Sequence, residues 1–120
     1  MLRSKKIYSH DGYTRWYSSI TATPISSPPP IPPGASVETH DLFINHVIGE
    51  DNKCPQAWCY EPLDHQGGTV WVPIQFGDIR AVAGGSFALS FNQVGQPAWV
   101  TFATIRRSVK YIDSPALHPN

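Results

Sequence analysis

The residues of this chain with the greatest capacity for chemistry lie in its middle third. They are imidazole and thiol side chains of the kind that bind zinc, namely His40, His46, Cys54, Cys59 and His65. On a strand His40 and His46 would share a face. The cysteine spacing is at the loose end of the zinc-finger patterns, and this histidine pair precedes the cysteines instead of following them. We therefore expect no metal and no cofactor, and the alternative is a zinc site built from His40, His46, Cys54 and Cys59.

The two cysteines allow two further interpretations. A Cys54–Cys59 disulfide would close a small loop through Pro55, and it would form only after release from a reducing cytoplasm. Cys59 and His65 have the residue types of a nucleophile and its base, but no nucleophile elbow or glycine-rich loop lies nearby. No phosphate-binding or dinucleotide motif occurs either. We therefore predict that the protein is not an enzyme, with buried cysteines that serve packing.

Aromatic residues are the other chemical resource, at 12% of the chain. Trp58 and Tyr60 share a face of a short strand expected over residues 56–61, and Trp71 lies on the strand expected next. Such residues either stack on a ring-shaped ligand such as a sugar or pack in a core or subunit interface. We favour packing. A carbohydrate-binding face made of Trp58, Tyr60 and Trp71 is the alternative.

The elements that carry these residues are predicted to be strands. Phe87, Leu89 and Phe91 alternate with small or polar residues, which is typical of a strand with one buried face. A Gly/Pro turn follows, and a second run over residues 98–107 is expected to pair antiparallel with the first. That run is apolar on both faces, which predicts a central strand or one that contacts a neighbouring subunit. Further strands are expected over residues 14–23, 35–45, 56–61 and 69–76. Residues 79–83 form a short piece before a hairpin turn at Gly84-Gly85.

Turn signals recur roughly every eight to twelve residues, and no window has a helical period. The pattern predicts an all-β fold, an antiparallel β-sandwich or jelly-roll-like domain with an extended N-terminal arm. Residues 1–34 are expected to form the arm, a first strand and a proline-rich strap over 24–34. Residues 35–112 would form the sandwich domain, and 113–120 a loose tail. A stiff connector is favoured for the strap over a docking peptide for a proline-recognition module.

Length and charge narrow the class of protein. One domain suits 120 residues, and nine basic and nine acidic side chains cancel, so we expect no direct nucleic-acid or membrane partner. Neither a secretory signal nor a membrane-spanning segment is recognisable, so synthesis in a reducing cytoplasm is expected. Charge is uneven, with four basic and one acidic residue in 1–17 but one basic and six acidic in 38–64.

The polar residues 1–13 are predicted to become ordered only against a partner. In this interpretation Arg3, Lys5, Lys6 and Trp16 form an assembly arm, in which the basic residues meet acidic groups such as Glu50 and Asp51 of another subunit. Deletion of residues 1–23 is accordingly expected to leave a folded domain that no longer assembles.

The order of segments resembles small β-sandwich proteins of phage virions. The matching features are a proline/glycine lead into a strand (PPIPPGASVETHDLFI), a short strand after a turn (QAWCYE), a small-residue tract before an alternating strand (AVAGGSFALSFNQ), and a Gly/Pro turn into a last strand that ends in basic residues (GQPAWVTFATIRR). They span about residues 32–107. The resemblance implies a symmetric, often trimeric, structural or decorating role on a virion.

Together these points predict a non-enzymatic phage structural protein, a capsid decoration or head–tail accessory subunit. Its partners would be copies of itself and other capsid or tail proteins, and its location the virion after synthesis in the host cytoplasm. Two alternatives remain open. One is a carbohydrate- or receptor-binding module of a tail fibre or spike, and the other is a small zinc-binding protein.

Overall fold

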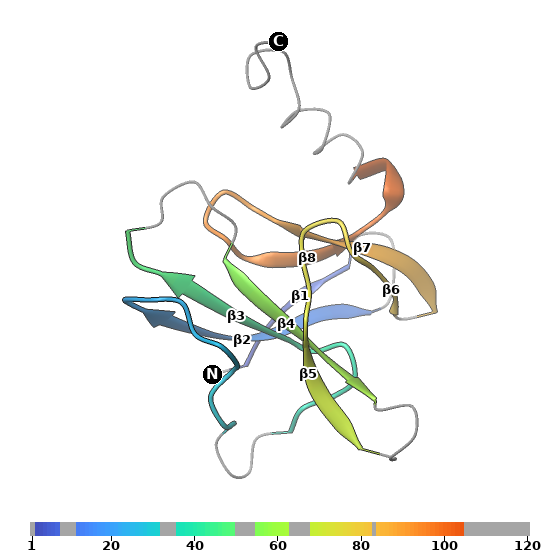
Figure 1. The fold of residues 1–120 in the computed structure, drawn as a ribbon. Helices are drawn as coiled ribbons and strands as arrows, with labels where there is room; N and C mark the ends of the chain where they lie inside the picture. The colour runs from blue at the N-terminus through green and yellow to red at the C-terminus, as the bar shows by residue number, and fades with distance from the viewer. Residues whose placement is uncertain are drawn as a thin grey trace.

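Two β-sheets stack to form the protein in a computed structural model that describes residues 2–7, 12–31, 36–49, 55–62, 68–82 and 84–104 (Figure 1). Sheet A has the strand order β1-β2-β3-β4-β5, with β1 Arg3–Lys6, β2 Tyr13–Thr21, β3 Leu42–Val47, β4 Gln56–Pro62 and β5 Thr69–Pro73. Sheet B has the order β6-β7-β8, with β6 Ile79–Val82, β7 Gly85–Phe91 and β8 Pro97–Val100. The predicted all-β sandwich is confirmed.

The core lies between the two sheets, where residues at alternate positions of β2, β3, β4, β7 and β8 pack together. Leu42 and Ile44 of β3 and Leu89 of β7 have no exposed surface, and Phe87 and Trp99 are nearly as well buried. These residues belong to one cluster that takes members from both sheets. The predicted buried face of β7 is therefore correct for Phe87 and Leu89, while Phe91 is partly buried at the margin of that cluster.

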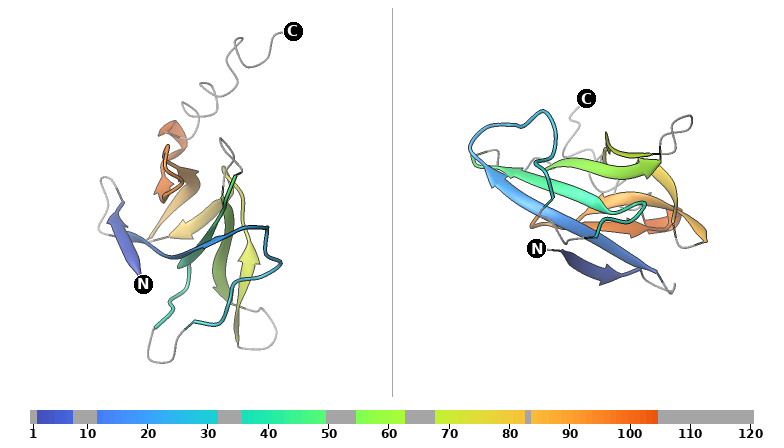
Figure 2. Two further views of the ribbon diagram at one scale, coloured as in Figure 1. Left: turned by 90° about the vertical axis from the view of Figure 1, so that its left-hand side faces the viewer. Right: turned by 90° about the horizontal axis from the view of Figure 1, so that it is seen from below.

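Sheet A is mixed, which corrects the expectation of antiparallel pairing throughout. β2 pairs parallel with β3, in a register that places Trp16 beside Leu42 and Tyr17 beside Phe43. Parallel neighbours need a long crossover connection. The connection here spans residues 22–41 and contains the strap. Its described part runs along the face of sheet A that is turned away from sheet B (Figure 2).

The N-terminal segment is a strand of the sheet, so the predicted free arm is wrong for Arg3–Lys6. β1 pairs antiparallel with β2, with Arg3 opposite Trp16 and Lys6 opposite Tyr13. Ile7 is only 2% exposed and belongs to the core. Since β2 lies between β1 and β3, the boundary predicted at residue 34 cuts through sheet A. Deletion of 1–23 would remove two of its strands and is not expected to leave a folded domain.

The last predicted strand is shorter than expected. β8 ends at Val100, and residues 102–104 form a single helical turn. β8 also lies at the edge of sheet B, so it is not the central strand that its apolar residues suggested. The described part of the predicted 35–45 strand begins only at Leu42, because residues 39–40 form a turn in which His40 has a φ of 72°. The tail 113–120 lies outside the described residues, which include no helix long and apolar enough to cross a membrane.

Candidate functional site

The outer face of sheet A carries a row of aromatic side chains contributed by neighbouring strands. Phe43 is the register partner of Trp58, and Tyr60 is the partner of Trp71. The ring centroid of Phe43 lies 6.4 Å from that of Trp58 and 6.0 Å from that of Trp71. Both ring pairs have an edge-to-face geometry. Tyr60 and Trp71 are tilted at 57° with centroids 4.9 Å apart. The three residues of the predicted aromatic face are therefore brought together.

Part of this row is covered, which changes what it can bind. Trp58 is 5% exposed and packs with Tyr17 and Phe43 in a second cluster, beneath Ile25 and Ile31 of the strap. A tryptophan that stacks on a sugar needs an open ring face. Trp58 does not offer one, so packing accounts for it better than glycan stacking. Only the Tyr60–Trp71 pair remains half-exposed.

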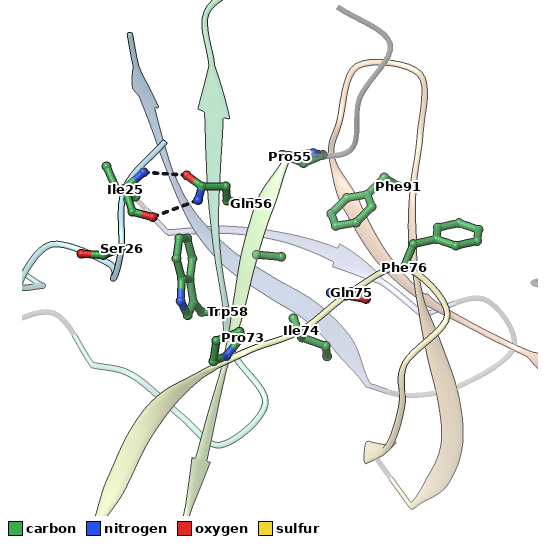
Figure 3. Close-up of a pocket in the computed structure, with 11 residues that line it drawn as sticks. Ile25, Ser26, Pro55, Gln56, Trp58, Pro73, Ile74, Gln75, Phe76 and Phe91 are labelled. Carbon is green, nitrogen blue, oxygen red and sulfur yellow. Dashed lines mark hydrogen bonds between the residues drawn. The ribbon is translucent and has the colours of Figure 1, made fainter. Parts of the chain in front are cut away.

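A groove opens beside this row, where β5 leaves sheet A (Figure 3). β5 ends at Pro73, and the following residues cross toward sheet B, held by a hydrogen bond from the Ile74 N–H to the Ala57 carbonyl. The groove encloses about 600 Å³. Its walls are mainly apolar, with Ile25 and Trp58 on one side and Phe76 and Phe91 on the other (Figure 3). We refer to it as the β4 groove.

The polar side chain at the top of the β4 groove is already occupied by the strap. Gln56 accepts a hydrogen bond from the Ile25 N–H and donates one to the Ile25 carbonyl, each at 2.9 Å (Figure 3). Its carbonyl oxygen also accepts from Nδ2 of Asn45 at 3.0 Å. Gln56 thus fixes the strap onto the sheet and has little capacity left for a ligand. The β4 groove suits an apolar group better than a sugar.

A second polar network anchors the other end of the crossover. Asp41, 3% exposed, accepts a 2.8 Å hydrogen bond from the Glu38 N–H and pairs with Arg15 of β2 at 3.1 Å. Arg15 also pairs with the Glu38 carboxylate. Burial raises the pKa of Asp41, against the opposing effects of the Glu38 N–H and the Arg15 charge. The network fixes the chain before β3, which is a structural role.

The candidate zinc ligands are not gathered in the described part of the chain. His40 lies in the turn before β3, where burial lowers its pKa. His46 lies near the end of β3, against Gly95 of the β7–β8 turn. No group of three histidine, cysteine or acidic side chains placed to bind a metal occurs among the described residues. Cys54 and His65 lie outside them.

Cys59 is a free thiol with no exposed surface, in the core between the sheets. A Cys54–Cys59 disulfide therefore does not form in this structure. Burial, followed by the charge of Glu61, raises the pKa of Cys59 to about 12. The thiol is the unreactive form of cysteine. Cys59 consequently serves packing, in agreement with the interpretation of the cysteines as packing residues.

The basic residues assigned to an assembly arm lie on β1 with exposed side chains. The guanidinium of Arg3 lies 5.9 Å from the ring centroid of Trp16. Trp16 itself is 4% exposed and belongs to the core, so it is not available to a partner. Lys5 and Lys6 form no ion pair with a carboxylate of the described residues. Glu50 and Asp51, their predicted partners, lie outside that part of the chain.

Three exposed apolar side chains that the sequence did not indicate lie on adjoining segments at one end of the sandwich. Ile20, Ile48 and Val94 are each 66–70% exposed. Ile20 is the register partner of His46, against which the β7–β8 turn packs, and the Ile48 N–H donates to the carbonyl of Thr21. The three residues thus come from adjoining segments, and we call them the end patch. Ile20 has the same parity on β2 as the core residue Trp16, so alternation alone suggested burial.

Comparison of the chain with protein-family models, with curated proteins and with solved structures finds no match. The function proposed below therefore depends on the geometry of the chain and on the resemblance of its segment pattern.

Proposed function

We propose that this protein is a non-enzymatic structural subunit of a phage particle, of the capsid-decoration or head–tail accessory type, which acts by associating with copies of itself and with neighbouring virion proteins. The end patch is the observation that carries the proposal of association. Exposed apolar side chains on adjoining segments favour protein–protein contacts, because water is released when they are covered. The virion setting is supported by the segment resemblance alone.

The other features of the described residues agree with a role in binding rather than catalysis. The buried thiol of Cys59 has a raised pKa, and the buried carboxylate of Asp41 is held by Arg15 in a structural network. The β4 groove adds a second apolar surface, large enough for side chains of a partner. These three features favour a subunit that works through surface contacts.

The mass of the purified full-length protein in solution tests association directly. We expect an oligomer over a series of concentrations by light scattering, and dissociation in the double variant Ile20→Asp/Ile48→Asp. Ile79→Asp is the matched control, since Ile79 is also exposed, at 44%, but lies on β6. A wild-type protein that stays monomeric at every concentration would remove the proposal of self-association.

The virion setting needs a separate experiment. When particles are produced in the presence of the wild-type chain and then purified, mass spectrometry should detect the chain in them. Particles assembled with the end-patch double variant should contain much less of it. If the wild-type chain is absent from purified particles, the virion role is wrong, even if the protein proves to be an oligomer.

A further inference from the structure

The edge strand β5 lacks the features that protect the other edges of the two sheets. β1 carries three basic side chains among its four residues, and β6 contains Arg80. On β8 the backbone N–H of Trp99 donates to Oγ1 of Thr14 at 3.0 Å. β5 has the sequence TVWVP, without a charged residue, and pairs only with β4 among the described strands. An uncharged edge of this kind is where another strand can add to a sheet.

Prolines at the two ends of the β4–β5 ladder show which backbone groups of β5 are free. Opposite pairs in an antiparallel ladder alternate between hydrogen-bonded and non-hydrogen-bonded pairs. Pro62 and Pro73 stand in the end pairs, and a proline has no N–H to exchange. These two pairs are therefore non-hydrogen-bonded, and so is the Tyr60–Trp71 pair midway between them. Thr69, Trp71 and Pro73 thus direct their backbone groups away from β4, to the open edge.

β5 is apolar on both faces, and neither face is fully covered. Trp71 is half-exposed on the outer face of sheet A, where it continues the aromatic row from Phe43. Val70 and Val72 alternate with Trp71, so they point to the side on which sheet B lies. Val70 is nevertheless 39% exposed, and Val72 is half-buried. A further strand beside β5 would cover apolar surface on both faces.

The free backbone groups of β5 are complementary to those of a second β5. In an antiparallel pair that overlaps all five residues, Trp71 of one copy stands opposite Trp71 of the other. The two Trp71 residues then exchange both hydrogen bonds, and each Thr69 N–H meets the Pro73 carbonyl of the second copy. Pro73 is needed there only as an acceptor, so its missing N–H costs nothing. Every free donor of the strand finds an acceptor in this register.

We propose that two copies of this chain associate through antiparallel pairing of β5 with β5, which joins their A sheets into one continuous sheet. The pairing is isologous, as expected for a twofold dimer. It places the two Trp71 rings side by side and Val70 of each copy opposite Val72 of the other, and such cross-strand pairs stabilise a sheet. The inference rests on the proposed association of copies and names a contact for it besides the end patch.

A disulfide experiment tests this register directly. Val70 and Val72 of different copies form a non-hydrogen-bonded pair, in which Cα atoms lie about 4.5 Å apart, within reach of a disulfide. Full-length Val70→Cys and Val72→Cys, both in a Cys54→Ser background, are mixed and treated with oxidised glutathione. A cross-linked dimer should appear on a non-reducing gel. Each variant alone is the matched control, because its two cysteines would lie diagonally, about 7–8 Å apart and beyond that reach.

The outcomes separate this contact from the proposed function. Equal cross-linking in the mixture and the controls would indicate random collision, and no cross-linking in the mixture would show that β5 does not pair with a second copy. Either result overturns the proposal. An oligomer that gives no cross-link still associates through another surface, so the proposed association stands while this contact fails. A mixed cross-link in a chain that is absent from purified particles supports the contact and removes only the virion role.

The end-patch double variant isolates the β5 contact for measurement, because the dissociation expected of it should stop at a dimer. Val70→Lys, added to that variant, should raise the dimer dissociation constant about five- to thirtyfold, since a lysine would then stand opposite Val72 at two places in the dimer. Ile79→Lys is the matched control, because Ile79 is exposed on the edge strand β6. An equal loss in the control, or a double variant that is already monomeric, would contradict the β5 contact.

Discussion

Oγ1 of Thr14 accepts a hydrogen bond from the backbone N–H of Trp99 at 3.0 Å, and this contact joins the two sheets across 85 positions of the chain. Thr14 lies on β2 and is 1% exposed, whereas Trp99 lies on the edge strand β8. An edge strand normally leaves such an N–H to water. Here the buried side chain of Thr14 accepts the hydrogen bond from this N–H, so the edge strand β8 of sheet B is attached directly to sheet A.

The first prediction concerns this contact. Thr14→Val keeps the shape of the side chain but leaves the Trp99 N–H without an acceptor. We expect the free energy of unfolding to fall by about 1–3 kcal/mol, the cost of an unsatisfied buried donor. Urea unfolding measures it. Thr14→Ser, which keeps the hydroxyl, should be clearly more stable than Thr14→Val, and equal stabilities would show that the bond contributes little.

The second prediction concerns the attachment of the strap. Gln56→Glu replaces the amide N–H that reaches the Ile25 carbonyl, 2.9 Å away, with a carboxylate oxygen. We expect a loss of about 1–3 kcal/mol in unfolding free energy and faster hydrogen exchange at the Ile25 amide. Gln75→Glu is the control, because Gln75 lines the same groove but is exposed. Unchanged exchange at Ile25 would contradict this role of Gln56.

The third prediction separates backbone strain from steric crowding. Gly84 and Gly95 both have a φ of 80°, but a Cβ at Gly84 would meet open space, whereas one at Gly95 would lie 2.7 Å from Cε1 of His46. Gly84→Ala should cost about 1–2 kcal/mol from the left-handed backbone alone. Gly95→Ala should cost more, and His46→Ala should recover the difference. Equal melting shifts in the two glycine variants would show that the turn does not press on His46.

The fourth prediction concerns Cys59. Because the pKa of its thiol is raised from 9.0 to about 12 in the folded protein, the folded state keeps the proton when the unfolded state loses it. The contribution of this thiol to the free energy of unfolding is fully present below pH 9 and is lost as the pH rises toward 12. Cys59→Ala should therefore flatten the decline of stability over that range. In a Cys54→Ser background, iodoacetamide should label the native protein at pH 8 far more slowly than the unfolded one.

Local pattern was enough to predict much of the sandwich. Alternation with a period of two identified β7 and its buried residues Phe87 and Leu89, and turn residues marked its boundaries. The short strand that became β4 was also expected, over residues 56–61. Such features depend on neighbouring residues only, so the sequence carries them without knowledge of the partner strands.

The sequence also brought attention to Trp58, Tyr60 and Trp71, which do lie together. It did not show that the strap would cover Trp58, since that depends on Ile25 and Ile31 reaching it from an earlier part of the chain. The β4 groove likewise exists only because β5 ends at Pro73 and turns toward sheet B. These properties of the candidate site are properties of packing.

What the sequence determined by itself was the class of fold and the strands with strong alternation, because steric preferences and burial of alternate side chains act locally. What only the tertiary structure decided was which strands become neighbours. The parallel pairing of β2 with β3, the place of β1 at the edge of sheet A and the exposure of Ile20 all follow from contacts between distant segments. A two-residue period predicts which side chains share a face of the strand. The extent of the opposing sheet determines how many of those side chains are buried.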